Sequence, residues 1–460
     1  MDTRTNGGGP SISRRSLLRS VGAAGLTGLA GCGSSEGMTG GGDTPEPTPT
    51  PVGNYPVSGD TATFGFNIAG SGPYSTSGQQ ERRGLELAVK HINEGGGWVS
   101  ADAYDSPLSG DGLLGKSVEY VVEDTQSSSD AARTGAEKLL NSDDAIMLAG
   151  GTSSGTGHVH QELAAEHQVV YMGTMSHEDA LTGADCNRYS FRELFNTHMT
   201  ARALAPVLVE EYGEDVDYVQ FFSKNDWGTA LRDEMDGALE GTGWSPVWNR
   251  GAQVGTRDYS QYIDDLEQVD HDVVILSLRG LDAANALREL REAFPETAFV
   301  LPLYSLEVAQ TAGDAIGGVL GTVAWSASID TPLSAAFREA FRNEYGSTTG
   351  SSKSAVPSGP AHVAYTQVLQ YASAVERAGT FNPNEVISQL EDHEYDAGLG
   401  TQTLRACDHQ AMRPVPVVRG RPEVQQSYGV YYSPLGDPRD VRYACDSGPA
   451  ANCGLGGSNQ

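Results

Sequence analysis

The sequence predicts an α/β protein built from two doubly wound lobes. From Thr61 onward, short apolar segments of strand length alternate with amphipathic segments of helix length, and short connections join them. Such alternation is typical of parallel sheets that helices cover on both faces. The pattern runs twice, because a second series of helices and strands starts near Met199. We therefore expect two similar lobes.

The first series opens with an apolar strand at Thr61–Ile68 and a helix at Gln79–Asn93, where apolar residues recur at three- and four-residue spacing. The same two patterns predict its remaining strands and helices. The strands are expected at Ser117–Glu123, Ala145–Ala149 and Val169–Met172, and the helices at Asp130–Leu140 and Val159–His167.

The second series repeats this alternation and is followed by a mainly helical segment. Its helices are expected at Met199–Tyr212, Thr229–Leu239, Tyr259–Leu266 and Asp282–Ala293, and its strands at Asp217–Phe222, Val273–Ser277 and Ala298–Leu301. After the apolar segment Leu320–Trp325, helices are expected at Leu333–Tyr345 and His362–Arg377, and strands near Thr401–Leu404, Val415–Val418 and Gln426–Tyr432. The late helices need an apolar surface to pack on, and we expect them to return to the first lobe.

The N-terminal residues are predicted to lie outside the fold. Ser13–Leu18 contains paired arginines and resembles a twin-arginine export signal, and the apolar stretch Val21–Ala30 follows it. A bilayer span needs about 20 apolar residues, so this stretch is typical of a signal peptide. Leu29–Cys32 resembles a lipobox, which makes residues 1–31 a lipoprotein signal and Cys32 the lipidated residue. The alternative is a plain cleaved signal. Residues 32–59, rich in Gly, Pro and Thr, would form a flexible tether.

The charge of the chain limits its partners. It carries 60 acidic and 30 basic side chains, for a formal net charge of −30, and only five of the basic residues are lysines. Nucleic acids are bound by Lys and Arg, so nucleic acid is not an expected partner. Many acidic residues and few lysines indicate a halophilic protein, because concentrated salt screens charge repulsion. The alternative is an ordinary acidic secreted protein.

Four cysteines follow Cys32, at positions 186, 407, 445 and 453. An even number in an exported chain predicts two disulfides among Cys186, Cys407, Cys445 and Cys453, with three possible pairings. We expect Cys407 to pair with Cys445 or Cys453, which would hold the C-terminal tail. Since the chain has no CxxC motif and no His–Cys cluster, we expect no metal.

Polar residues follow several predicted strands, at the sheet edge where open α/β sheets bind ligands. The loop Gly70–Ser75 lacks the third glycine of a dinucleotide-binding motif, and no GxxxxGK[ST] motif occurs, so we expect no nucleotide cofactor. This loop instead presents Tyr74 at a strand end. Ser176 and His177 follow a later strand, and Trp227 and Arg279 follow strands of the second series. For His177 the alternative is a surface or capping role, and for Trp227 a place in the core.

Gly151–Gly155 matches GxSxG between a strand and a helix. This pattern is also found in serine hydrolases, with Ser153 as nucleophile and a later histidine such as His362, His393 or His409 as base. No sequence around these histidines resembles a catalytic loop, so we expect no enzyme. The hydroxyls of Ser153 and Ser154 at a helix N-terminus would instead receive a carboxylate.

Several segments together resemble the leucine/isoleucine/valine-binding family of ABC-transporter substrate-binding proteins. They are Gly72–Pro73 with Gly78–Val89, Leu148–Ser154, Tyr189–Arg192, Lys224–Gly228 and Arg405–Gln410. The resemblance covers about Thr61 to Tyr432 and implies two lobes joined by three crossovers, with a ligand cleft between them. It implies lobe I at residues 60–192 and 326–410, lobe II at 193–325 and 411–445, and a tail at 446–460.

The resemblance also implies roles for individual residues. Ser154, with its neighbour Ser153, and Ser176 with His177 would hold a ligand carboxylate, Trp227 would be a cleft aromatic, and Tyr74 would reach the ligand. The acid that binds an amino acid's ammonium in the family would fall near Leu303, where this chain offers only Tyr304 or Glu307. The expected ligand is a branched-chain amino acid or a related small amide or carboxylate, and this departure leaves amides, urea-like solutes and aromatic carboxylates open.

The sequence thus predicts an exported solute-binding protein, anchored by lipid to the outer face of the cytoplasmic membrane. It would act as a monomer and deliver its solute to the permease subunits of an ABC importer. The alternatives are a ligand-sensing receptor domain and the GxSxG hydrolase.

Overall fold

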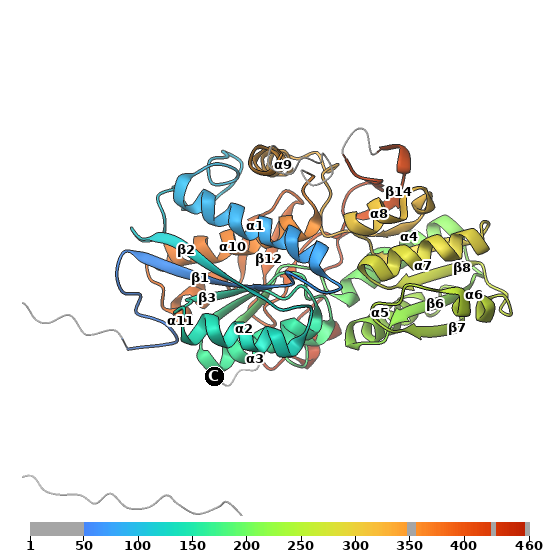
Figure 1. The fold of residues 1–460 in the computed structure, drawn as a ribbon, viewed down its shortest axis with the longest axis horizontal. Helices are drawn as coiled ribbons and strands as arrows, with labels where there is room; N and C mark the ends of the chain where they lie inside the picture. Colours follow the sequence, from blue (N-terminus) through green and yellow to red (C-terminus); the bar gives the residue numbers. More distant parts are fainter. Residues whose placement is uncertain (1–49, 347–355, 425–428, 456–460) are drawn as a thin grey trace, which may run out of the picture. The chain divides into compact units, whose positions relative to one another are not determined.

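The computed structural model describes residues 50–346, 356–424 and 429–455 (Figure 1). The predicted signal at 1–31, the lipidation site Cys32 and most of the tether lie outside the described residues, as do residues 456–460 of the tail. The first three residues of the predicted strand Gln426–Tyr432 also lie outside them.

The first lobe contains a sheet of five parallel strands in the order β2-β1-β3-β4-β5. The strands are β1 (Thr61–Ile68), β2 (Ser117–Asp124), β3 (Met147–Gly150), β4 (Val170–Gly173) and β5 (Ser190–Arg192). Helix α1 (Ser75–Glu94) covers one face, and α2 (Ser129–Asn141) and α3 (Ser154–His167) cover the other (Figure 1). Phe64, Phe66 and Ile68 of β1 are buried, as a strand covered on both faces requires.

The late helices return to this first lobe, which confirms the expectation. They are α9 (Pro332–Tyr345), α10 (Gly359–Ala378) and α11 (Pro383–Leu390), and their apolar residues share one core with β1 and α1. Helix α10 packs directly on α1 at Gly84. A Cβ at Gly84 would come within 2.1 Å of the Ala361 carbonyl oxygen, so only glycine permits this close approach.

The second lobe contains a seven-stranded sheet in the order β15-β14-β10-β9-β8-β6-β7, parallel except at β14 and β15. Its strands are β6 (Asp217–Ser223), β7 (Ser245–Ala252), β8 (Val273–Ser277), β9 (Ala298–Leu303), β10 (Leu320–Thr322), β14 (Val417–Gly420) and β15 (Tyr432–Pro434). Its helices are α4 (Thr197–Tyr212), α5 (Asp226–Leu239), α6 (Ser260–Leu266), α7 (Gly280–Ala293) and α8 (Leu306–Ala312). A small antiparallel sheet is formed by β11 (His393–Asp396), β12 (Thr401–Leu404) and β13 (Ala411–Met412).

The predicted strands and helices of both series are present, with ends that shift by a few residues. The sequence did not predict β5, β7, β11, β13, α8 or α11. Strand β7 lies at the sheet edge, and most of its residues before Gly251 are exposed. It therefore has no apolar run to reveal it.

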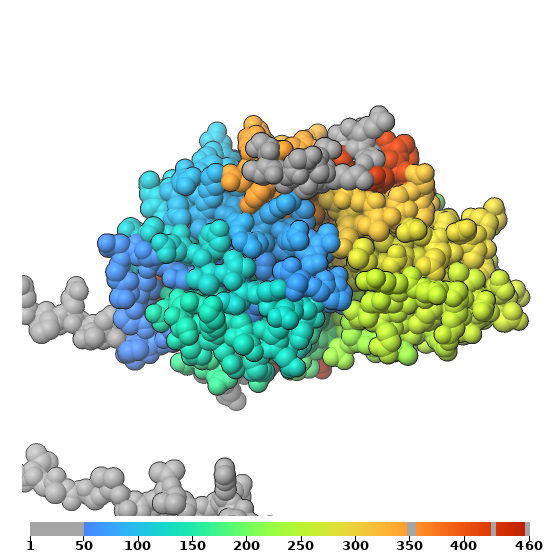
Figure 2. Space-filling model, in the orientation of Figure 1, coloured from blue at the N-terminus to red at the C-terminus, as the bar shows by residue number. Residues whose placement is uncertain are grey.

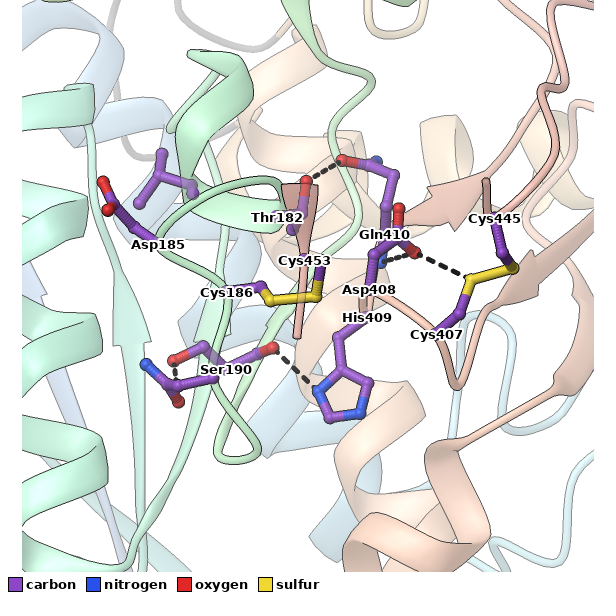
Figure 3. The surroundings of a disulfide bond; sticks show 12 residues. Thr182, Asp185, Cys186, Ser190, Cys407, Asp408, His409, Gln410, Cys445 and Cys453 are labelled. Atoms are coloured by element: carbon purple, nitrogen blue, oxygen red, sulfur yellow. Dashed lines mark hydrogen bonds between the residues drawn. A yellow bond between two sulfur atoms is a disulfide. The ribbon is translucent and has the colours of Figure 1, made fainter. Parts of the chain in front are cut away.

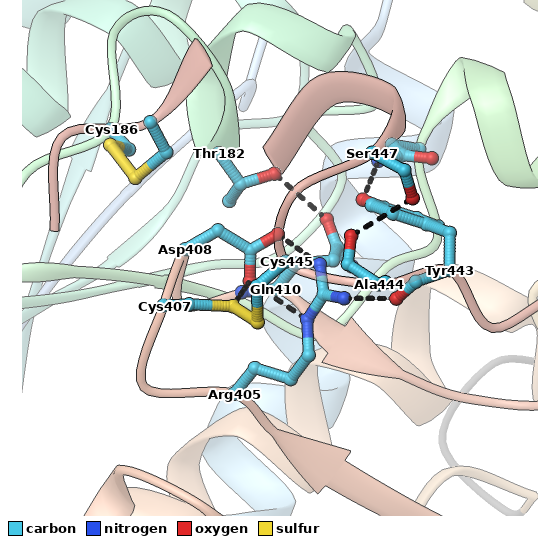
Figure 4. A network of polar contacts seen from close by, with 12 residues as sticks. Thr182, Cys186, Arg405, Cys407, Asp408, Gln410, Tyr443, Ala444, Cys445 and Ser447 are labelled. Atoms are coloured by element: carbon cyan, nitrogen blue, oxygen red, sulfur yellow. Dashed lines mark hydrogen bonds and ion pairs between the residues drawn. A yellow bond between two sulfur atoms is a disulfide. The ribbon is translucent and has the colours of Figure 1, made fainter. Parts of the chain in front are cut away.

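The chain passes between the two lobes three times, after β5, after β10 and after β13. After β15 it returns once more to the first lobe, where two disulfides hold it (Figure 3). Cys407 pairs with Cys445, one of its two expected partners, and Cys186 pairs with Cys453. Arg405 pairs with Asp408 and donates to the Tyr443 carbonyl, so the returning segment is also held by charge-assisted bonds (Figure 4).

Candidate functional site

A cavity of about 250 Å³ lies between residues of the two lobes, at the carboxyl ends of their parallel strands. The two lobes meet where the blue-to-teal surface borders the yellow-green surface in Figure 2. The cavity is lined by Tyr74, Ser127, Ser129, Ser153, Ser154, Gly155, Asn225, Asp226, Trp227, Val254 and Arg279. Five of the eight predicted ligand residues thus come together, and we name this space the serine chamber.

Helices α2, α3 and α5 are among the helices that start at the serine chamber, and their N-termini lie at its wall. Helix α2 begins after Ser128, α3 after Ser153 and α5 after Asn225. Ser153 Oγ accepts from Thr156 N at 3.4 Å, and Asn225 Oδ1 accepts from Gly228 N at 2.8 Å. Helix N-termini carry partial positive charge, so this wall favours an anion.

The predicted serines have different tasks in the structure. Ser154 lines the chamber, and its Oγ also accepts from the backbone N–H groups of His177 and Glu178, both at 3.2 Å. Ser176 is 1% exposed, donates to the carbonyls of Gly151 and Ser153, and does not line the chamber. Ser176 therefore positions the loop that carries Ser153 and does not itself line the chamber.

His177 and Trp227 form a buried contact between the lobes. Trp227 Nε1 donates to His177 Nδ1 at 2.7 Å, and His177 Nε2 bonds Thr200 Oγ1 at 2.8 Å. Burial lowers the pKa of His177 well below its usual value, and the nearby Arg192 and Arg279 lower it further. The imidazole is therefore neutral and contacts Trp227 of the other lobe without lining the chamber. Trp227 itself lines the chamber.

Arg279 supplies the positive charge of the serine chamber. It lies at the start of α7, and its guanidinium carbon stands 5.4 Å from the ring centroid of Tyr74. Its Nη2 is buried and has no hydrogen-bond partner among the described residues. Burial lowers the pKa of Arg279, and the acids Glu81 and Glu307 raise it without forming an ion pair with it in the described chain. Arginine stays protonated in proteins, so this cation is available to an anionic ligand.

Tyr304 and Glu307 do not line the serine chamber; Tyr304 lines a neighbouring cavity together with Arg279, and Glu307 lines a cavity together with Ser77. The Tyr304 ring stands 5.2 Å from that of Tyr432, and its hydroxyl lies close to Gly420 of β14. It therefore belongs to the core of the second lobe. Glu307 accepts from Ser77 Oγ at 3.4 Å, and burial raises its pKa.

The structure adds wall residues that the sequence did not single out. Ser127, Ser129, Asn225 and Asp226 follow strands β2 and β6, so strand-end placement could have identified them. Among the described residues, Asp226 is the only acid that lines the chamber.

The structure does not assemble a hydrolase triad. Ser153 Oγ bonds Thr156 at the N-cap of α3, and His362 and His409 bond other groups, including the carbonyls of Ala397 and Ser190. In the described part of the chain no histidine bonds Ser153. No His, Cys, Asp and Glu cluster that could hold a metal ion occurs in the same residues. None of the described helices is both long and apolar enough to cross a membrane.

The buried state of His177 predicts a pH effect on stability. Its folded pKa is depressed, so the stability that it contributes is present above about pH 6.5 and is lost as the pH falls. In denaturant titrations from pH 8 to pH 5, the stability advantage of the wild type over His177→Gln should shrink by up to about 1.4 kcal/mol per pH unit below about pH 6.5. Parallel curves would contradict this expectation, and His167→Gln at the end of α3 is the control.

Comparisons with known proteins agree with the fold. Residues 61–425 match the Periplasmic binding protein family model. The structure of an amino acid ABC transporter substrate-binding protein from Pseudomonas fluorescens Pf-5 aligns with a TM-score of 0.74 at 21% identity, covering 87% of this chain and 100% of that one. The fold is thus that of a type I periplasmic binding protein, with two lobes and a cleft.

Sequence relatives lead to the same family. Leu/Ile/Val-binding protein homolog 1 of Brucella abortus (strain 2308) is 24% identical over 336 residues, 71% of this chain and 81% of that protein. The leucine-, isoleucine-, valine-, threonine-, and alanine-binding protein of Pseudomonas aeruginosa is 22% identical over 356 residues, 75% of this chain and 86% of that protein. The chain belongs to the Periplasmic binding protein family, whose members are substrate-binding proteins rather than enzymes.

Proposed function

We propose that this chain is the solute-binding protein of an ABC importer and that its serine chamber binds a small organic carboxylate. The buried Arg279 guanidinium carries the proposal, because it forms no ion pair in the described chain and its Nη2 has no hydrogen-bond partner there, which is costly until an anion joins it. Three helix N-termini and the hydroxyls of Ser153 and Ser154 support the same ligand charge. A branched-chain amino acid or a related carboxylate fits this description.

The proposed mechanism is capture by closure of the two lobes. The carboxylate would bind Arg279 and the serine loop, while Tyr74 and Trp227 enclose its apolar part. Asp226 is available for an ammonium group if the solute is an amino acid. The closed lobes would then dock on the permease, and the solute would be released by reopening.

We further propose that the protein is exported as a monomer and anchored through Cys32 to the outer face of the cytoplasmic membrane. We also propose that it is adapted to concentrated salt. The acidic, lysine-poor composition supports the last point. A receptor that senses the same solute is the second candidate. A permease gene beside this one would favour transport, and a kinase gene would favour sensing.

The test uses the full mature protein purified in molar KCl. Native mass spectrometry would show a retained solute, and thermal unfolding would be followed with L-leucine, 4-methylpentanoate, benzoate and acetamide. A carboxylate at 100 times its Kd should stabilise the protein by about 2.7 kcal/mol, whereas neutral acetamide should not. Absence of both a retained solute and any stabilisation would refute solute binding.

A further inference from the structure

A fully buried acid, Glu81, lies beneath the loops that carry the ligand residues. It belongs to α1, has an exposed fraction of 0%, and lies at the ends of three neighbouring strands. Its Oε2 accepts from Thr152 Oγ1 at 2.5 Å, and its Oε1 bonds Thr174 Oγ1. Thr152 directly precedes Ser153, and Thr174 lies two residues before Ser176. Glu81 therefore holds two of the first-lobe loops that face the second lobe, those after β3 and after β4.

The hydrogen bonds around Glu81 suit a protonated carboxyl group. Thr174 Oγ1 also lies 2.8 Å from the Gly150 carbonyl, which can only accept. When Glu81 is neutral, its proton goes to Thr174 Oγ1, and the Thr174 hydroxyl is free to donate to Gly150. Thr152 Oγ1 accepts from Ala69 N at 3.0 Å and donates to Glu81 in the same arrangement. Every group then has a partner, and the Gly150 carbonyl also accepts from Thr174 N at 2.9 Å and from the Tyr171 hydroxyl at 3.0 Å.

Arg279 is the charged residue of the chamber whose field acts on the pKa of Glu81. No cation forms an ion pair with it among the described residues, and Arg279 lowers its pKa only through its field. Tyr171 of β4 also faces it, but burial raises the pKa of that phenol and keeps it neutral. On its own helix, Arg82 pairs with Glu86 at the surface and Arg83 lies over the ring of Tyr345. Burial raises the pKa of Glu81 to about 7, despite both hydroxyls and Arg279.

We propose that Glu81 is a positioning residue that takes up a proton from solvent when the serine chamber binds a carboxylate. This rests on the proposed function. An anion against Arg279 cancels the field that favours the ionised form of Glu81, so protonation and anion binding strengthen each other. The neutral acid in turn holds the Thr152 and Thr174 loops in their bonded geometry.

The proposal predicts that affinity depends on pH in one direction. The affinity for 4-methylpentanoate should fall by up to about tenfold per pH unit as the pH rises above about 7. In Glu81→Gln, which keeps a neutral side chain of the same size, the affinity should not vary over this range. Glu86→Gln on the same helix changes a surface acid and should behave as the wild type.

Two measurements test the proposal. Isothermal titration of wild type in two buffers of different ionisation enthalpy at pH 7 should show net proton uptake, and it needs no variant to fold. Infrared spectra of the wild type should show a protonated carboxyl band that is absent from Glu81→Gln. The titration midpoint of this band should rise when 4-methylpentanoate is added, but not when KCl is added at the same concentration. If L-leucine is the only solute that stabilises the protein, it replaces 4-methylpentanoate in both measurements. Stabilisation without proton uptake, or with an unmoved midpoint, would overturn this inference and leave solute binding intact. No stabilisation by any solute would refute the proposed function itself.

Discussion

Replacing Arg279 by methionine is expected to weaken carboxylate binding roughly 30-fold or more, because a buried charge pair contributes about 2–5 kcal/mol to a complex. Methionine keeps much of the length of the side chain but supplies no charge and no hydrogen-bond donor. The loss should appear for 4-methylpentanoate and for L-leucine alike, measured by isothermal titration at fixed salt. Arg279→Lys keeps the charge without the planar fork and should give an intermediate affinity.

A matched control separates this effect from a change in overall charge. Arg250 lies on the edge strand β7, its side chain is 45% exposed, and it pairs with Asp265 at 3.4 Å. Arg250→Met removes the same charge from the same lobe and should leave the affinity unchanged. Equal losses of affinity in both variants would show that Arg279 acts only through net charge and does not contact the solute.

Replacing Arg413 by methionine is expected to lower the free energy of unfolding by about 3–5 kcal/mol, because it leaves a buried carboxylate without its cation. Arg413 Nη1 lies 3.2 Å from Glu193 Oε1, and the two side chains are 0% and 1% exposed. Arg413 also donates to the Ala324 carbonyl. These residues belong to the three passages between the lobes, so the pair joins all of them. Denaturant unfolding at pH 8 measures the loss.

Two further variants test the reason for this loss. Arg419 and Glu211 form a partly exposed ion pair at 2.6 Å, and Arg419→Met should cost no more than about 1 kcal/mol. Adding Glu193→Gln to Arg413→Met removes the unpaired charge and should recover part of the stability. A double variant as unstable as Arg413→Met would show that lost packing, and not the unpaired charge, dominates.

The elements that the sequence predicted well are those with a periodic apolar pattern. Strand β1 was expected at its observed bounds because both of its faces are buried, and α1 was recognised by its apolar face. The edge strand β7 and the short helix α8 had no comparable signal. Strand β7 is mostly exposed, and α8 has only 7 residues, too few for its apolar spacing to stand out as periodic.

The site was predicted in its position but only partly in its details. Residues that follow parallel strands must meet at one sheet edge, so Tyr74, Ser153, Ser154, Trp227 and Arg279 could be grouped before their contacts were known. The direction of a side chain cannot be derived in this way. Ser176 turns toward backbone carbonyls, and Tyr304 turns into the core of the second lobe.

The sequence alone determined the two-lobed α/β class and the sheet edge at which polar residues gather, because burial imposes local periodicity on strands and helices. The tertiary structure decided which groups meet over long separations. It pairs Cys186 with Cys453, joins Glu193 to Arg413, and places Glu81 between Thr152 and Thr174. It also leaves Nη2 of Arg279 without a hydrogen-bond partner in the described chain. Such contacts depend on side-chain direction and burial in three dimensions, and no local pattern of residues encodes them.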